Sequence, residues 1–217
     1  DHIITGSPYL TSFVSTLSSN VSEIPTCVLS INENIGLGKR NDNIFTVGWI
    51  GSGSTSKYID QIARPLKEFL YNHSSRLILI GYRGSAFQNL HNVQLIDWSD
   101  NNEHLYLPKI NVGIMPLTDD KWSRGKCGFK LIQYMSYGKP TISTPLEANK
   151  KIDGSSGNLF ANSETEWFDA LLSVYQNGDV YRLVGSININ RVAQNYLLDV
   201  VVPKYESIFK NCLNVQN

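Results

Sequence analysis

Basic residues precede a segment with helical periodicity in the second half of the chain. Arg124 and Lys126 stand in a stretch that continues through Gly128, and Lys130 follows shortly after it. The first N–H groups of a helix have no partner within the helix, and the helix dipole favours negative charge at that end. Cations beside a helix start are therefore suited to a phosphate. We predict an anion site here.

The helix that we predict over about 127–137 has one polar and one apolar face. The polar stripe consists of Lys126, Lys130, Gln133 and Tyr137. The apolar face consists of Leu131, Ile132 and Met135. A polar stripe is usually the solvated side of a surface helix. This one carries cations and amides without a carboxylate, which favours an anion site.

Two further places have side chains or backbone that suit a ligand. Gly51, Ser52 and Gly53 follow an apolar run, and glycine lets backbone approach an anion closely, although many such turns use glycine only for tight geometry. A second strip follows the next two strands and holds Gly81, Tyr82, Arg83, Asp97 and Trp98. Its aromatic and arginine side chains could pack on a nucleobase. The alternative, that Trp98 and Trp122 cover sheet edges, stays open.

Apolar runs and helical segments alternate along most of the chain. We predict strands at about 44–50, 76–80, 93–97, 110–115, 141–143 and 157–160. We predict helices at about 8–18, 55–71 (bent or split by Pro65), 102–107, 127–137, 164–175, 180–195 and 202–213. This alternation predicts an α/β fold with a Rossmann-like parallel sheet and helices on both faces, in which ligands bind beyond the carboxyl ends of the strands.

Composition narrows the classes of function. Lys+Arg and Asp+Glu are both 19 in 217 residues, so the net charge is zero and nothing supports nucleic-acid binding. Cys27, Cys127 and Cys212 are scattered, which favours free thiols in a reducing compartment. We expect no metal, because the adjacent Asp119 and Asp120 rarely suffice without other ligands. No apolar run approaches the ~20 residues of a membrane helix.

Three segments resemble the donor-binding half of a retaining GT-B glycosyltransferase of glycosyltransferase family 4. They are Val47–Ser52, Asn111–Leu117 and Lys130–Pro140, within a similarity that covers about 44–213. The resemblance implies two Rossmann-like domains that face each other across a cleft. It assigns 1–29 to the last βα unit of an N-terminal acceptor domain, 30–43 to a linker and 44–217 to the donor-binding domain with its C-terminal helices. We expect a piece of a longer protein, and we expect the last helix to dock on 1–29.

The resemblance also implies roles for single residues. Gly51 to Gly53 lie near the donor diphosphate, and the backbone of Gly128, Phe129 and Lys130 meets the phosphate. Gln133 and Gly125 stand where the family often has two Glu, of which the one at 133 binds ribose. Because the usual Arg and Lys after the first strand are missing, we expect Arg124, Lys126 and Lys130 to supply the charge, with Arg124 and Lys130 as catalytic residues.

The function implied is transfer of a sugar, with retention, from a nucleoside-diphosphate sugar to a glycan, lipid or other hydroxyl acceptor held by the missing domain. The donor is a substrate, and no cofactor is expected. The fragment alone is expected to be inactive. The alternatives are an inactive binding module, a sugar-nucleotide epimerase and, more distantly, a response-regulator-like or flavodoxin-like domain. A cytoplasmic location is expected, and peripheral contact with the inner face of the membrane is left open.

Overall fold

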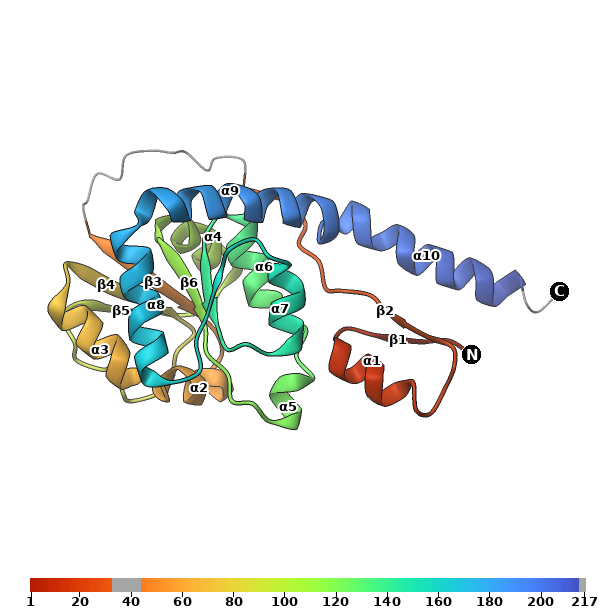
Figure 1. Ribbon diagram of the computed structural model, residues 1–217, viewed down its shortest axis with the longest axis horizontal. Helices are drawn as coiled ribbons and strands as arrows, with labels where there is room; N and C mark the ends of the chain where they lie inside the picture. Colours follow the sequence, from red (N-terminus) through yellow and green to blue (C-terminus); the bar gives the residue numbers. More distant parts are fainter. Residues whose placement is uncertain (33–43, 215–217) are drawn as a thin grey trace.

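A six-stranded parallel sheet forms the centre of the protein (Figure 1). The computed structural model describes residues 1–32 and 44–214. Along the sheet the strand order is β5-β4-β3-β6-β7-β8. The strands are β3 (Phe45–Ile50), β4 (Ser75–Ile80), β5 (Val93–Ile96), β6 (Val112–Met115), β7 (Thr141–Ser143) and β8 (Leu159–Phe160). The predicted α/β fold is confirmed, and each predicted strand is present with slightly different bounds.

Helices cover both faces of the sheet, and each face has its own apolar core. One face carries α2 (Ser56–Asp60), α3 (Ala63–Asn72) and α8 (Glu164–Gln176), with Leu66, Phe69 and Trp167 fully buried. The other carries α4 (Asp100–Tyr106), α6 (Phe129–Ser136) and α7 (Glu147–Asp153), with Leu131, Ile132 and Met135 buried. Helix α9 (Gly178–Asn195) contributes to both cores and leads into α10 (Leu198–Asn214), which extends away from the sheet (Figure 1).

The strand order reverses between β3 and β6. At this point the helix α6 packs against β6 and is bonded to the end of β3. Gly113 in β6 allows the close approach, because a Cβ there would lie 2.3 Å from Cγ of Tyr134. The Tyr134 hydroxyl accepts a hydrogen bond from Ile50 N at 2.9 Å, at the carboxyl end of β3. Burial raises the pKa of Tyr134 above its usual range. Helix α6 and the end of β3 are thus joined where a doubly wound sheet opens a crevice.

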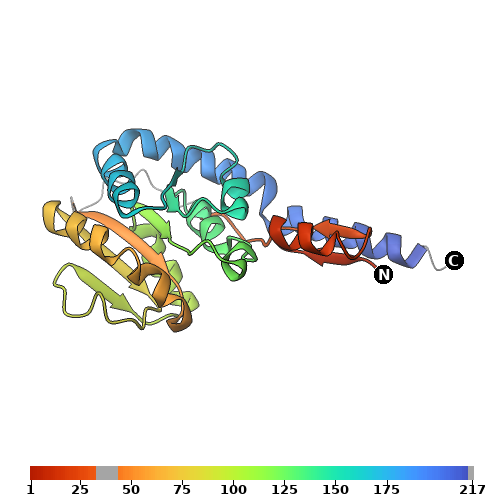
Figure 2. The same ribbon diagram turned by 60° about the horizontal axis from the view of Figure 1, so that its bottom comes forward.

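Residues 1–29 form a small βαβ unit beside this domain (Figures 1 and 2). It consists of β1 (Ile3–Thr5), α1 (Pro8–Val14) and β2 (Val21–Glu23), with β1 and β2 parallel. Two backbone hydrogen bonds connect it to the start of α10, from Val28 N to Tyr196 O at 2.9 Å and from Leu198 N to Val28 O at 3.0 Å. Helix α10 therefore begins against the N-terminal segment, as expected for the last helix.

Several element predictions differ from the structure. Helix α1 ends at Val14 rather than near 18, and β2 was not predicted as a strand. The helix predicted over 55–71 is split into α2 and α3, as predicted, but the break lies before Ala63, and Pro65 stands in the first turn of α3, where proline is tolerated. The short helices α5 (Lys121–Arg124) and α7 were missed, as were the 3-10 turns η1 (Gly53–Thr55) and η2 (Leu107–Lys109). Most of the predicted linker, 33–43, lies outside the described residues.

Replacing Tyr134 by Phe tests the bond between α6 and β3. Tyr134→Phe leaves the buried Ile50 N–H without its hydroxyl partner. We expect the free energy of unfolding to fall by about 1–3 kcal/mol, measured by urea denaturation. Tyr71→Phe is the matched control, since the side chain of Tyr71 is exposed. Equal stability of the two variants would contradict the role given to the Tyr134 hydroxyl.

Candidate functional site

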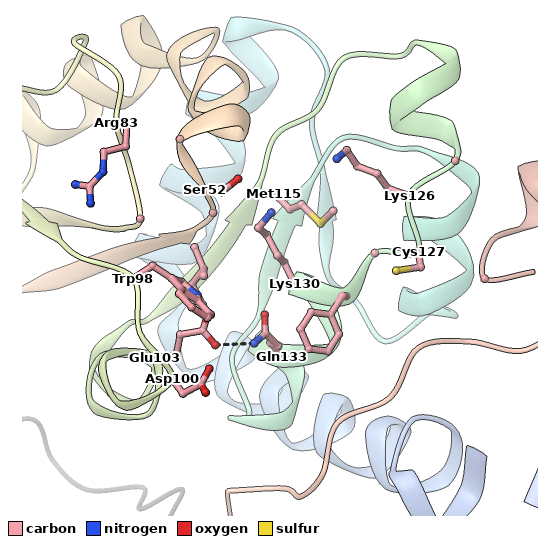
Figure 3. Close-up of a pocket in the computed structure, with 18 of the residues that line it drawn as sticks. Ser52, Arg83, Trp98, Asp100, Glu103, Met115, Lys126, Cys127, Lys130 and Gln133 are labelled. Carbon is pink, nitrogen blue, oxygen red and sulfur yellow. Dashed lines mark hydrogen bonds between the residues drawn. The ribbon is translucent and has the colours of Figure 1, made fainter. Parts of the chain in front are cut away.

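A cavity of about 1050 Å³ opens beyond the carboxyl ends of β3 and β6 (Figure 3). It lies between the turn after β3, the start of α6 and the start of α4. The residues that line it are Gly6, Leu10, Ile50, Gly51, Ser52, Gly53, Gly81, Arg83, Trp98, Asp100, Glu103, Met115, Gly125, Lys126, Cys127, Gly128, Phe129, Lys130 and Gln133. The structure thus brings together the predicted glycine turn, Lys126 and Lys130 of the predicted basic segment, and Trp98.

One wall of the cavity is positive. Helix α6 begins after Gly128, whose φ of 69° is left-handed, and no described side chain caps it. The left-handed backbone angle favours glycine, and a Cβ at this position would also lie 2.3 Å from Cδ1 of Ile152 in α7. The first N–H groups of α6 are then available to the cavity. Lys126 and Lys130 line the same wall.

The ammonium group of Lys130 is half-buried. Its Nζ lies 5.9 Å from the centroid of the Trp49 ring. Burial and, to a lesser extent, the nearby charge of Lys126 lower the pKa of Lys130 to about 8, while Glu103 acts in the opposite direction. An ammonium group with few waters interacts strongly with an anion, because the local dielectric constant is low.

The turn after β3 is held by packing and by hydroxyl groups. A Cβ at Gly51 would lie 2.1 Å from the Trp49 ring. Gly81 has a φ of 77°, and its Cβ would lie 2.1 Å from the carbonyl oxygen of Gly51. Ser52 N donates to Thr55 Oγ1 at 2.9 Å, which closes the turn. These glycines are therefore required by close packing of the strand ends, and the same turn faces the cavity.

The opposite wall is aromatic and acidic, and its central residue, Glu103, was not predicted. Glu103 Oε1 accepts a hydrogen bond from Trp98 Nε1 at 2.7 Å, and Oε2 accepts one from Gln133 Nε2 at 2.8 Å (Figure 3). The expected stripe without a carboxylate is thus corrected, since α4 supplies one to Gln133. The partners are 30 residues apart, a distance that local spacing does not reveal.

Arg124 lies elsewhere. Its guanidinium makes two hydrogen bonds to Asp119, at 2.6 and 3.0 Å, and it is not among the described residues that line the cavity. This ion pair holds the pKa of Asp119 below its usual range. Asp120 caps α5 by accepting a hydrogen bond from Ser123 N at 2.7 Å. Arg124 was expected beside the phosphate, and Asp119 of its own loop binds it instead.

Three other predicted positions also fall outside the described lining of the cavity. Tyr82 is buried and donates its hydroxyl to Asp60, and burial together with this bond raises its pKa to about 12. Asp97 forms a 2.7 Å ion pair with Arg83. Tyr137, expected on the polar stripe, is buried. Of Tyr82, Asp97 and Trp98, which we predicted as possible nucleobase contacts, only Trp98 lines the cavity, and Arg83 of the same strip joins it there.

The N-terminal unit contributes to the cavity, which the sequence did not indicate. Gly6 and Leu10 line it, and Ser7 Oγ donates to the carbonyl of Gly125 at 3.2 Å. The three cysteines are free. Within the described residues, no group of three or more His, Cys, Asp or Glu side chains is placed to hold a metal ion. None of the helices in the described ranges is long and apolar enough to cross a membrane.

The sheet order and the cavity at the reversal point define a Rossmann-like domain of the GT-B type. The family described as "Glycosyl transferases group 1" matches residues 44–177, and the chain belongs to this family. No curated protein matches the sequence.

Solved structures with the same fold are distant in sequence. Sucrose-phosphate synthase from Thermosynechococcus elongatus has a TM-score of 0.77 at 13% identity, over 99% of this chain and 59% of that one. A glycosyltransferase from Rickettsia africae ESF-5 has a TM-score of 0.78 at 12% identity, over 98% of this chain and 64% of that one. HepE from Anabaena, solved with UDP and glucose, has a TM-score of 0.75 at 11% identity, over 96% of this chain and 62% of that one. The chain thus spans about three fifths of these proteins.

Lys130→Met removes a charge that the fold holds in a poorly hydrated place. The folded pKa of about 8 lies below the usual 10.5, so the unfolded chain binds more protons between these pH values. The resulting destabilisation is complete below pH 8 and disappears as the pH rises to 10.5. We therefore expect Lys130→Met to raise the free energy of unfolding by about 1–3 kcal/mol at pH 7, and by less near pH 10.

Urea denaturation at the two pH values measures this difference. Lys150→Met is the control, because Lys150 is exposed on α7, and we expect it to change stability by no more than about 0.5 kcal/mol. A Lys130→Met protein that is no more stable than wild type at pH 7 would show that Lys130 is well hydrated.

Proposed function

We propose that this chain binds a nucleoside-diphosphate sugar and that the full-length protein transfers the sugar to a hydroxyl acceptor with retention, as in glycosyltransferase family 4. One observation carries the proposal. A single cavity at the reversal point of the sheet has a wall with Lys126, Lys130 and the uncapped start of α6, and an opposite wall with Trp98 and Glu103. The first wall suits a diphosphate, and the second suits a nucleoside.

The positive wall has a direct part in the proposed reaction. When the bond between the sugar and the diphosphate breaks, negative charge grows on the leaving group. Lys130, whose ammonium group lies beside the Trp49 ring, and the first N–H groups of α6, which the helix holds in place, stabilise that charge with little rearrangement. Preorganised groups of this kind are typically the largest contribution to catalysis. Lys130 is accordingly the proposed catalytic residue, and Lys126 supports it.

The acceptor belongs to the part of the protein that precedes the donor domain. We assign residues 1–29 to the acceptor domain, because this unit already contributes Gly6 and Leu10 to the edge of the cavity. Apolar side chains of this unit are exposed, with Phe13 at 60% and Leu17 at 72%. The remainder of the acceptor domain would cover them. A glycan, a lipid or another hydroxyl compound is the proposed acceptor.

A second candidate, a binding module without transferase activity, is favoured by one observation. Gly125 and Gln133 both line the cavity, at the two positions where the family often has carboxylates. Loss of both acids would remove contacts to the donor sugar and to the ribose while leaving the phosphate wall intact. The complexes of HepE with UDP and glucose and with UDP-glucose support a nucleotide-sugar ligand for either candidate.

Calorimetric titration with UDP-, GDP- and ADP-sugars tests donor binding by the 217-residue chain. We expect one of them to bind, and Lys126→Ala and Lys130→Ala each to weaken it by about tenfold or more, as charge-assisted hydrogen bonds are lost. Arg124→Ala is the matched control, because its charge is paired with Asp119, and we expect a change within about twofold. Binding that depends on Arg124 and not on Lys130 would refute the assignment.

The stereochemistry of the product tests the proposed reaction in the full-length protein. We expect the anomeric configuration of the donor to be kept, as observed by NMR before the product equilibrates, and we expect the 217-residue chain alone to show no transfer. Inversion would contradict the proposed mechanism. Donor binding without transfer or donor hydrolysis by the full-length protein would favour the binding module.

A further inference from the structure

The carboxylate of Glu103 is fixed within the cavity by two hydrogen bonds. Trp98 Nε1 lies 2.7 Å from Oε1, and Gln133 Nε2 lies 2.8 Å from Oε2. The three residues come from the connection after β5, from α4 and from α6, so they meet only in the folded protein (Figure 3). Each carboxylate oxygen can accept more than one hydrogen bond. Glu103 therefore keeps capacity for a ligand while its orientation is set by the protein.

A carboxylate in this place selects the part of a ligand that it contacts. It repels phosphate and accepts hydrogen bonds from hydroxyl groups. Lys130 and Gln133 are three residues apart in α6, which separates them by about 4.5 Å along the helix axis. The amide of Gln133 that binds the carboxylate is therefore less than one helical turn from the cation, although the carboxylate itself belongs to the opposite wall. One nucleotide can reach both, with its phosphate at Lys130 and its sugar hydroxyls at Glu103.

The identity of residue 133 is explained by the same contact. A glutamate there would place a second carboxylate against Glu103, and like charges at this distance repel. Glutamine instead donates its amide hydrogen to Glu103. In the structure the negative charge that faces the cavity thus comes from α4, and the residue on α6 orients it.

We infer that Glu103, held by Trp98 and Gln133, accepts hydrogen bonds from the ribose hydroxyls of the nucleoside diphosphate and sets a preference for ribonucleotides. This inference rests on the proposed function, since it concerns the same cavity. It names the carboxylate of α4 as a residue that determines specificity, with Gln133 as its positioning residue.

The experiment compares a nucleoside diphosphate with its 2′,3′-dideoxy counterpart, which lacks both hydroxyls. Calorimetry with UDP, GDP and ADP first selects the tightest ligand of the 217-residue chain. We expect the wild-type chain to bind the dideoxy compound at least about tenfold more weakly, since hydrogen bonds to a charged acceptor are lost. In Glu103→Gln the two compounds should bind within about threefold of each other, because a neutral amide is the weaker acceptor.

Two further variants separate a specific contact from a general effect of charge. The exchange Glu103→Gln with Gln133→Glu moves the carboxylate to α6, and we expect it to restore the discrimination. Asp100→Asn removes the same charge from α4 without touching the bonds to Trp98 or Gln133, and we expect the discrimination to remain. Inorganic pyrophosphate should bind Glu103→Gln at least as tightly as wild type. Thermal unfolding checks that each variant is folded.

The outcomes distinguish this inference from the proposed function. Discrimination that survives in Glu103→Gln, or that is lost equally in Asp100→Asn, overturns the role of Glu103 and leaves donor binding in place. Equal binding of the two compounds by the wild-type chain also overturns the role of Glu103 and leaves donor binding in place. No binding of any nucleoside diphosphate overturns both. The inference is supported if the discrimination between the two compounds is lost in Glu103→Gln, kept in Asp100→Asn and recovered in the exchanged variant.

Discussion

The half-buried ammonium group of Lys130 is the constraint on which the site depends. A charge at this place costs stability, as its lowered pKa of about 8 shows, and the fold offers it no closely bonded carboxylate among the described residues. A diphosphate would supply the missing counter-charge. The surrounding elements serve to keep this group in place: Tyr134 joins α6 to the end of β3, and Gly128 lets α6 start against α7.

The cavity owes its polarity to two helices that approach it from either side of the reversal point. Helix α6 brings Lys130 and uncapped N–H groups, and α4 brings the carboxylate of Glu103. The two helices meet at the hydrogen bond between Gln133 and Glu103. A ligand with one anionic end and one end rich in hydroxyl groups fits this division. The family of group 1 glycosyl transferases, to which the chain belongs, provides the class of reaction that such a ligand would undergo.

The features that were predicted correctly are those that depend on the local pattern of residues. Apolar runs identified the strands, and Gly128 followed by a periodic segment identified the start of α6. Contacts between distant segments were not accessible in this way. Arg124 was expected at the phosphate, although Asp119, five residues before it, forms an ion pair with it. Tyr82 was expected to contact a nucleobase and Tyr137 to belong to the polar stripe, and both are buried. Glu103 was missed because its importance arises from Trp98 and from Gln133 on another helix.

A crystal structure of the chain with a bound nucleoside diphosphate tests the central claim most directly. The account predicts density for the diphosphate between Lys130 and the turn at Gly51 to Gly53, with its oxygens within hydrogen-bonding distance of Lys130 Nζ and of the first N–H groups of α6. A diphosphate bound at Arg124, or anywhere outside the cavity between β3 and β6, would contradict it.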